Sequence, residues 1–508
     1  MTLSPSANFQ NRPELDQRSL SADDEATIVT FHYRARQLGS DIHDRPWGDR
    51  RAESGDRNKS AGDRPVTASG EHPGSMPGRR GLLAAIGIGN AIEWYDWSIY
   101  TTFSVFFSSQ FFTSGNADTD LLSTLAVFAV GFVARPFGGL LFGWMADRIG
   151  RQPAMTLAVA VAAAGSLIIG ITPTAATIGV AAPVVLLLAR LIQGLAQGGE
   201  LPSAQTYLVE VSPAPRRGLW SSLIYFSGSL GTLFGTVLGA LLAALLSHAD
   251  LLAFGWRVPF LFGGILGVFA VVMRKRLAET PVFARAPAPR TTGRRESATW
   301  QQFVARPSVL LRVIGLTGGG TITFYSWSVA APTLAIGQRG TDAAGALWAG
   351  SVATVVFIAV LPLWGALSDR IGRRPVLLIS WVLLAMLSFP LQALIQGQAW
   401  QLLVAMSIAL ILVAGTVSIA PALFAEMFPT GVRALGFGLP YALAVAAFGG
   451  TAPYLQAYAS AHHAPAAFTW WVIALVVVSV ITTLLSPETR GRDLDTVDSP
   501  LASSGKRA

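Results

Sequence analysis

GWMADRIGR at residues 143–151 and GALSDRIGR at residues 365–373 are two copies of one pattern, G-x-x-x-D-R-x-G-R, that begin 222 positions apart. A second pattern, E-x-x-P-x-x-x-R, occurs at residues 210–217 and again at residues 426–433, 216 positions apart. One such motif alone is equally typical of a charged loop that fixes membrane orientation. Two different motifs that recur at nearly the same offset indicate two related halves in parallel orientation.

The stretches between these motifs are almost free of charge. Of the 508 residues, 52% are hydrophobic and 13% are charged, whereas a soluble domain carries about 25% charged residues. No charged residue occurs within 375–425 or within 434–487. Because a helix needs about 20 residues to cross the hydrocarbon, each stretch holds two crossings, joined by turns at 396–398 and 461–463. This pattern argues against a soluble enzyme or a nucleic-acid binder and indicates a membrane protein.

The same rule predicts an all-α membrane protein of twelve transmembrane helices in two six-helix bundles. The expected spans lie near 82–110, 121–144, 154–172, 181–207, 219–246, 257–273, 309–335, 345–367, 375–395, 400–425, 434–459 and 466–485.

The composition divides the chain into five parts. Residues 1–80 are rich in charged and small residues and poor in aliphatic ones, so we expect a disordered tail. Translation starting at Met76, just before the first apolar run, is an alternative. Residues 274–308 are rich in arginine and contain Pro281, Pro287 and Pro289, so they predict a cytoplasmic linker between the bundles. The expected boundaries are a tail at 1–80, a first bundle at 81–273, the linker at 274–308, a second bundle at 309–486 and a tail at 487–508.

Arginine placement predicts the orientation. With both termini in the cytoplasm, the loops on that side hold most of the basic residues, while the opposite loops hold only Arg257 and Arg339. The positive-inside rule therefore predicts a multi-pass protein of the cell inner membrane with both ends cytoplasmic. The net charge of +8 is then a topology signal, and it does not indicate a nucleic-acid partner.

Further motifs resemble a known family. They are GNAIEWYDW at 89–97, ARPFGG at 134–139, R-x-x-Q-G at 190–194 followed by GGE at 198–200, and FGGTAP at 448–453. From about residue 80 to 495 the chain resembles the major facilitator superfamily, and within it the metabolite–proton symporter family. The resemblance implies a twelve-helix carrier whose relatives import carboxylates such as 2-oxoglutarate, citrate and shikimate, or osmolytes such as betaines and proline.

The chain departs from the family pattern where a central cavity is expected. Leu201-Pro202-Ser203 replaces an aromatic residue and a glycine after GGE, and Tyr441-Ala442 replaces the family's Tyr-Asn. The seventh span also carries fewer tyrosines than usual around Tyr325. The identity of the substrate therefore does not carry over from the family.

Ionisable residues at membrane depth are the candidate functional groups, because such residues are costly there. Glu93 lies about 18 Å into the first span and Arg135 about 15 Å into the second, counted at 1.5 Å per residue, so we expect them at similar depth. Asp96 is three residues from Glu93 and shares its helix face. We expect Glu93 and Asp96 to carry protons and Arg135 to bind a carboxylate. The alternative is a structural cluster joining two helices, with Asp96 facing a neighbouring helix.

The fourth span supplies a second pair. Arg190 matches the arginine that the resemblance links to proton transfer, and its alternative role is that of a snorkelling or carbonyl-bound side chain near the outer face. Glu200 lies ten residues further on, near the midplane. Tyr325 and Tyr441 are expected to line the substrate cavity. The repeated loops are expected to act as gates, through Gly143, Asp147, Arg148, Gly150, Arg151, Gly365, Asp369, Arg370, Gly372 and Arg373.

These observations predict a proton-coupled symporter that imports a small polar metabolite, with an organic carboxylate favoured. One alternative is a zwitterionic osmolyte symporter, and another is a transporter-like membrane sensor. We find no phosphate-binding loop, zinc motif or nucleophile elbow, and there is no cysteine, so no enzymatic role is predicted. The expected partners are the substrate, protons and the lipid bilayer, the driving force is the proton gradient without a cofactor or metal, and the expected functional unit is a monomer.

Overall fold

A computed structural model describes residues 79–149, 151–198, 205–206, 208–275, 307–428, 433–492 and 494. Met76 and nearly all of the predicted tails and linker lie outside these ranges, so their boundaries remain predictions. Within them the chain forms helices and short turns, without a strand. Among the described residues, eight helical segments are long and apolar enough to cross a membrane.

The first half contains six long helices: α2 (Arg79–Phe111), α3 (Ala117–Ile149), α4 (Arg151–Ile171), α6 (Ala181–Gln197), α8 (Arg217–Leu245) and α10 (Arg257–Lys275). Short pieces join them, namely α5 (Ala175–Ile178), η1 (Ala214–Arg216), α9 (His248–Asp250) and the π turn η2 (Leu251–Gly255). Their order matches the predicted spans, and their bounds agree to within about five residues except in the fourth span. That span was predicted to reach residue 207, but α6 ends at Gln197, and most of the following residues lie outside the described ranges.

In the second half, π turns or short breaks interrupt three of the six spans. The seventh span runs through α13 (Pro307–Phe324), η3 (Tyr325–Ala330) and α14 (Ala331–Arg339). The remaining elements are α15 (Ala343–Ile371), α16 (Arg373–Leu394), α17 (Ala399–Val417) with α18 (Ala420–Ala425), α19 (Arg433–Ala444) with η5 (Val445–Gly449) and α20 (Ala452–Ala461), and α21 (Pro465–Leu485). Joined in this way, the helices give the predicted twelve-span, two-bundle fold.

Both predicted turns in the charge-free stretches are present. Gly397 has a φ of +102° between α16 and α17, and His463 has a φ of +56° between α20 and α21. A left-handed conformation ends a helix abruptly, so the apolar chain reverses within a few residues. Length alone therefore located these crossings correctly.

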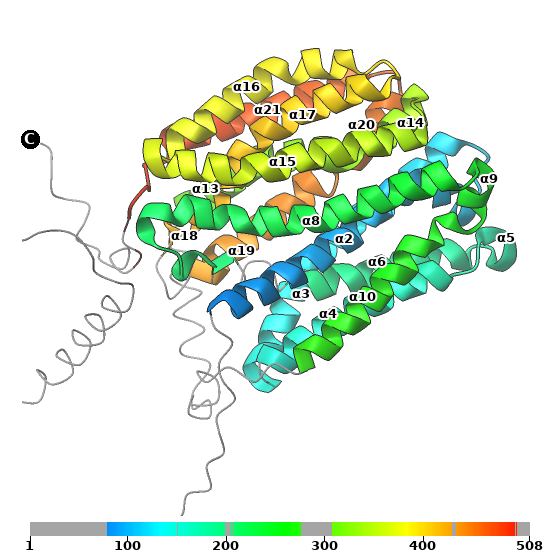
Figure 1. Cartoon of the computed structure of the whole chain (residues 1–508), viewed down its shortest axis with the longest axis horizontal. Helices are drawn as coiled ribbons and strands as arrows, with labels where there is room; N and C mark the ends of the chain where they lie inside the picture. The colour runs from blue at the N-terminus through cyan, green and yellow to red at the C-terminus, as the bar shows by residue number, and fades with distance from the viewer. Residues whose placement is uncertain are drawn as a thin grey trace, which may run out of the picture. The chain divides into compact units, whose positions relative to one another are not determined.

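Each half has its own hydrophobic core. Aromatic residues such as Phe103, Phe107 and Phe128 dominate that of the first half, and leucine, alanine and valine dominate that of the second. Along the boundary α8 lies beside α15, and α2 lies beside α8 (Figure 1). A Cβ on Gly365 would lie 2.6 Å from the carbonyl oxygen of Gly218, so only glycine permits this approach of α15 to α8.

Candidate transport site

A cavity of about 50 Å³ is lined by residues of both halves. This volume holds a few water molecules. The first half contributes Glu93, Trp94, Trp97, Ser98, Phe128, Arg135, Tyr225 and Thr232, and the second contributes Gly320, Thr321, Phe324, Tyr325, Val329 and Tyr441. The predicted acid, arginine and two tyrosines thus meet around one cavity, which is called the central cavity below.

Arg135 projects from α3 and is half-buried. Its guanidinium carbon lies 4.1 Å from the ring centroid of Trp97 and 4.2 Å from that of Phe132. One terminal nitrogen donates to Oε1 of Gln197 at 3.3 Å, and its Nε–H finds no acceptor among the described residues. Aromatic faces therefore stabilise the positive charge and hold a flat donor group at the cavity wall.

Tyr325 and Tyr441 line the same cavity from the second half. Tyr325 begins η3, and π turns inside helices are frequent at functional sites. Its ring packs edge-on against Phe132 of the first half, with centroids 5.2 Å apart. The hydroxyl of Tyr441 lies 3.3 Å from that of Tyr225 on α8. Sequence reasoning missed Tyr225, because no motif distinguishes it from the other apolar positions of its helix.

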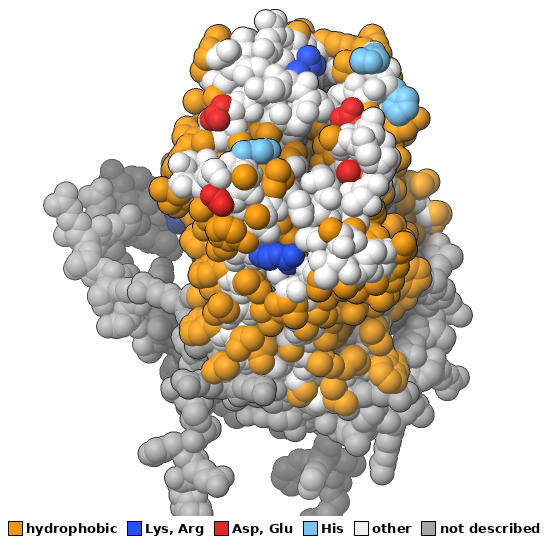
Figure 2. Space-filling view, turned by 90° about the vertical axis from the view of Figure 1, so that its right-hand side faces the viewer, with side chains coloured by type: hydrophobic (Ala, Val, Ile, Leu, Met, Phe, Trp, Pro, Cys, Tyr) orange, Lys and Arg blue, Asp and Glu red, His pale blue; other side chains and the backbone are white. Residues whose placement is uncertain are grey.

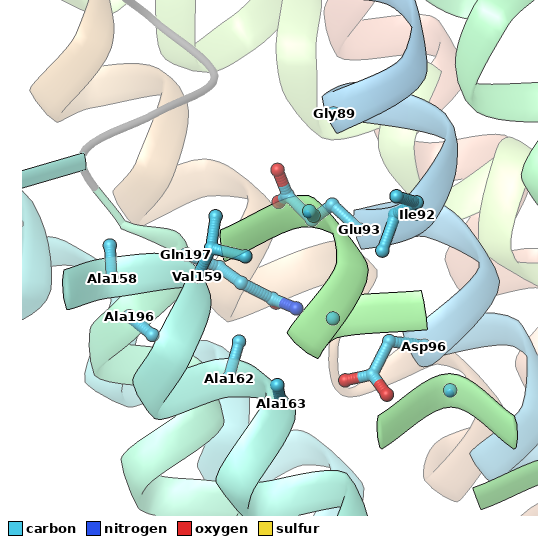
Figure 3. A pocket seen from close by; sticks show the side chains of 13 residues that line it. Gly89, Ile92, Glu93, Asp96, Ala158, Val159, Ala162, Ala163, Ala196 and Gln197 are labelled. Carbon is cyan, nitrogen blue, oxygen red and sulfur yellow. The ribbon is translucent and has the colours of Figure 1, made fainter. Parts of the chain in front are cut away.

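Glu93 and Asp96 both line a second cavity of about 40 Å³, formed by α2, α4, α6 and α10 (Figure 3). They share a helix face, as expected, but only Glu93 also reaches the central cavity. In Figure 3 the two carboxylates point in different directions. Asp96 therefore faces neighbouring helices, which was the structural alternative considered from the sequence.

The carboxylate of Asp96 is buried and accepts two hydrogen bonds. One comes from the hydroxyl of Ser166 on α4, and the other comes from Nε2 of Gln193 on α6 at 2.7 Å. Gln193 also accepts a hydrogen bond from Nη1 of Arg190 at 2.9 Å. A buried chain of polar groups thus runs from Asp96 through Gln193 to Arg190. Gln193 belongs to the R-x-x-Q-G motif, which was the available signal for its role.

Arg190 has 0% of its surface exposed, so the snorkelling alternative is wrong. Its guanidinium carbon lies 3.9 Å from the ring centroid of Tyr100 and 4.4 Å from that of Trp97. These rings and the carbonyl of Gln193 surround the charge, because helix α6 turns this position toward α2 and away from lipid.

Several predicted residues cannot be placed. Glu200 and Gly150 lie outside the described residues. Gly143, Asp147 and Arg148 belong to α3 and Arg151 begins α4, but their side chains are outside the described part of the structure.

The second copy of the repeated motif, residues 365–373, is fully described and joins the two halves. It was predicted as a loop, but it forms the last turns of α15 and the start of α16, with only Gly372 between the two helices. Asp369 accepts hydrogen bonds from the backbone N–H groups of Gly218 at 2.8 Å and Leu219 at 2.9 Å, at the start of α8. Arg373 binds the same carboxylate at 2.8 Å. A carboxylate at a helix N-terminus satisfies otherwise unpaired donors and the helix dipole. Asp369 therefore binds the C-terminal end of α15 to the N-terminal end of α8.

The second repeated motif forms two ion pairs across the halves. Arg217 donates to Glu426 at 3.0 Å, and Arg433 donates to Glu210 at 2.7 Å. Arg373 also reaches Glu426, at 3.3 Å. Each acid of one half thus binds the arginine of the other. We call this end of the molecule, on the left of Figure 1, the motif end.

The chain after α21 adds to these contacts. Glu488 accepts hydrogen bonds from the backbone N–H groups of Arg373 and Arg374, at 2.9 and 3.0 Å, and so caps α16. Gly372, with a φ of +105°, makes the turn that directs these donors toward it. Arg370 is exposed, and its carbonyl accepts a hydrogen bond from Arg490 at 2.5 Å.

The halves also touch at the opposite end, which Figure 2 shows. Thr333 of α14 donates to the carbonyl of Thr101 of α2 at 3.0 Å. Beside it Leu121, Leu125 and Leu334 belong to one apolar cluster shared by both halves. Isolated charged side chains lie among hydrophobic and uncharged ones on this face (Figure 2). Contacts at both ends therefore enclose the central cavity.

Comparisons with known proteins agree with this architecture. The model of the Major Facilitator Superfamily matches residues 86–340, and that of the Sugar (and other) transporter family matches residues 288–500. The chain also resembles a solved D-xylose–proton symporter, with a TM-score of 0.62 and 21% identity over 81% of this chain and 98% of the other. At that identity the likeness concerns the fold alone.

Relatives with higher identity are transporters of small metabolites. The alpha-ketoglutarate permease of Escherichia coli (strain K12) is 37% identical over 411 residues, covering 80% of this chain and 94% of the relative. The citrate–proton symporter of Klebsiella pneumoniae is 31% identical over 74% of this chain and 85% of its own length. The proline/betaine transporter of E. coli (strain K12) is 30% identical over 82% of this chain and 85% of its own length. The chain therefore belongs to the major facilitator superfamily, among its proton-coupled metabolite transporters.

Proposed function

We propose that this protein is a symporter that uses the proton gradient to import a small organic carboxylate. The observation that carries the proposal is Arg135 in the wall of the central cavity, where aromatic rings hold its planar donor group. A guanidinium binds a carboxylate through two parallel hydrogen bonds. Tyr325 and Tyr441 add hydroxyl groups on the facing wall. The identities to an alpha-ketoglutarate permease and a citrate–proton symporter support this substrate class.

Glu93 supplies the link between proton and anion. It shares the cavity wall with Arg135, so an ionised Glu93 places a negative charge where a carboxylate has to bind. Protonation removes this repulsion and leaves the positive charge of Arg135 for the substrate. The anion and the proton thus favour each other's binding, and the loaded site is close to neutral when it moves between the two sides of the membrane.

Transport follows from rocking of the two halves around the central cavity. Opening toward the motif end requires breaking the Arg217–Glu426 and Arg433–Glu210 pairs, and opening toward the other end requires parting the apolar cluster and the Thr333–Thr101 contact. We place the motif end and both termini in the cytoplasm, in the inner membrane, because its loops hold the surplus of arginine. Both halves and the contacts between them belong to one chain, so we propose that a monomer is the functional unit.

A zwitterionic osmolyte is the second candidate substrate. The identity to a proline/betaine transporter favours it, and so do Trp94 and Phe324, whose rings meet in the cavity wall 5.5 Å apart. Aromatic faces attract quaternary ammonium groups. The cation at Arg135 favours the anion, because a zwitterion presents a positive group as well.

Uptake by proteoliposomes tests the proposal. The purified protein is given radiolabelled 2-oxoglutarate, citrate, proline or glycine betaine, each with and without an inward proton gradient. We expect a gradient-dependent accumulation of a carboxylate that an ionophore abolishes. Uptake of the betaine alone would support the second candidate, and equal accumulation of a carboxylate without the gradient would refute proton symport.

A further inference from the structure

One indole ring lies against two arginines of the first half, the half-buried Arg135 and the fully buried Arg190. The guanidinium carbon of Arg135 lies 4.1 Å from the ring centroid of Trp97, and that of Arg190 lies 4.4 Å from it. Trp97 is 6% exposed and lines the central cavity. Arg135 belongs to that cavity, whereas Arg190 ends the polar chain from Asp96. Trp97 is therefore where the buried polar chain meets the cavity.

We propose that Trp97 and Gln193 are the positioning residues that couple the charge of Asp96 to anion binding at Arg135. The inference rests on the proposed function and adds the route by which a proton inside the first half affects the central cavity. Gln193 fixes the distance between Asp96 and Arg190, and Trp97 holds Arg190 and Arg135 against one ring.

The route begins with a carboxylate and a guanidinium that an amide separates. Nε2 of Gln193 donates to Asp96 at 2.7 Å and to Ser166 at 2.9 Å, while its Oε1 accepts from Arg190 at 2.9 Å. The amide polarises toward both charges and keeps them apart. Asp96 can therefore accept a proton without breaking a direct ion pair, which would hold it ionised far more strongly.

The other groups around Asp96 are few. The ionisable neighbours on its own helix are Glu93 and Tyr95, and α6 contributes Arg190. From α4 and α10 the described residues that face it are uncharged, namely Ser166 and Gly263. Asp96 is thus the acid whose charge the buried Arg190 is arranged to balance.

Protonation of Asp96 changes this balance. The proton comes from water and forms an O–H bond on the carboxylate, which becomes neutral while Arg190 stays charged. Two cations, Arg190 and Arg135, then lie against the electron-rich ring of Trp97, and Asp96 no longer carries a negative charge to balance Arg190. An anion bound at Arg135 offsets the two positive charges, so the proton and the substrate anion stabilise each other across the ring.

The glycines of neighbouring helices show that the arrangement is closely fitted. A Cβ on Gly131 would lie 3.2 Å from Cη2 of Trp97, and a Cβ on Gly165 would collide with the side chain of Gln193. Both positions thus leave room for the coupling side chains. Gly165→Ala consequently offers a way of displacing Gln193 without altering any polar group.

The test compares Trp97→Leu, Trp97→Phe and Gly165→Ala with the unaltered protein. The control is Trp256→Phe, because Trp256 is a buried tryptophan that also lies against an arginine, Arg257 at 4.2 Å, but lines neither cavity. Size-exclusion chromatography checks that each variant is folded. The measurements are the Kd for 2-oxoglutarate in detergent at pH 6 and pH 8, and gradient-driven uptake and equal-pH exchange in proteoliposomes.

Coupling free energies between sites correspond to about 5- to 150-fold changes in affinity. We expect the unaltered protein and Trp256→Phe to bind 2-oxoglutarate at least about 5-fold more tightly at pH 6 than at pH 8. Trp97→Leu and Gly165→Ala should lose most of this difference and most gradient-driven accumulation while they retain exchange. Trp97→Phe keeps an aromatic face and should fall between them.

The outcomes separate the two proposals. If the unaltered protein shows neither pH-linked binding nor gradient-driven uptake, the proposed function fails and the coupling route fails with it. If the unaltered protein is coupled and the folded Trp97→Leu and Gly165→Ala variants keep its pH difference, only the route through Trp97 and Gln193 is overturned. Equal loss in Trp256→Phe would also overturn it, because the effect would then come from removing any buried indole.

Discussion

Glu426 and Arg217 join the two halves through a buried ion pair of 3.0 Å, and their repeat counterparts Glu210 and Arg433 form the reciprocal pair at 2.7 Å. The two pairs differ in environment. Glu426 is 0% exposed, whereas the side chain of Glu210 is 37% exposed. Removing one partner of a buried pair costs about 3–5 kcal/mol, and a pair at the surface contributes about 0–1 kcal/mol.

Glu426→Gln should therefore open the motif end, because it leaves Arg217 and Arg373 buried without their shared acid. The chain has no cysteine, so Ser221→Cys gives a single reporter at a buried contact between the halves. We expect a hydrophilic maleimide to label this cysteine at least about tenfold faster in the Glu426→Gln background, since 1.4 kcal/mol corresponds to a factor of ten. Glu210→Gln is the matched control and should change labelling less. Equal labelling in all three backgrounds would contradict the proposed gate.

Gly365→Ala should impair closure of the motif end by a steric route. Its Cβ would lie 2.6 Å from the backbone oxygen of Gly218, and overpacking of this kind costs about 1–3 kcal/mol. We expect a clear fall in both the uptake rate and the thermal midpoint. Gly337→Ala is the control, because its Cβ would lie 3.6 Å from Val105, an ordinary contact. A Gly365→Ala protein as active and stable as the control would disprove the close approach.

Glu488 should make stability depend on pH. Partial burial alone would raise its pKa, but backbone N–H donors of Arg373, Arg374, Thr489 and Arg490 outweigh this and lower the pKa below its ordinary value. A depressed pKa stabilises the fold above the ordinary glutamate value of about 4.3 and loses that contribution as pH falls through the lowered value. The thermal midpoint of the unaltered protein should thus drop in acid by more than that of Glu488→Gln. Parallel pH curves for both proteins would refute this contribution.

Arg135 should discriminate between the candidate substrates. Hydrogen bonds to charged groups contribute about 1.5–3 kcal/mol, so Arg135→Gln should raise the KM for a carboxylate about 10- to 150-fold. Arg135→Lys keeps the charge without the planar fork and should recover only part of the loss. The KM for a betaine, if one is carried, should change far less. Unaltered carboxylate uptake by Arg135→Gln would remove the arginine from the site.

Much of the fold could be predicted from the sequence, because every helix that crosses the hydrocarbon needs about 20 apolar residues. The charge-free run at 375–425 had to contain two crossings, and the turn at Gly397 lies where length placed it. The π turns η3 and η5 were not foreseen. They depend on how a span packs against its neighbours, and the apolar runs that contain Tyr325 and Phe448 look like any other membrane helix.

For the candidate site, the position of a residue in the sequence predicted its depth in the membrane but not the direction in which its side chain points. Glu93 and Arg135 were expected at similar depth, and both line the central cavity. Asp96 was grouped with Glu93 because the two share a face, yet its carboxylate turns to Ser166 and Gln193. A three-residue separation still rotates the helix by about 60°, which is enough to send neighbouring acids to different partners.

The sequence by itself specified twelve membrane crossings, their duplication and the ionisable residues within them. It could do so because unpaired backbone groups and charged side chains are costly in lipid, which restricts a spanning segment to an apolar helix with few charges. Only the tertiary structure decided which arginine lies against which ring, and that the acid of each half binds the arginine of the other. Those contacts join residues up to 223 positions apart, from Glu210 to Arg433. Their geometry arises from helix rotation and from the packing of segments far apart in the chain, which local sequence does not specify.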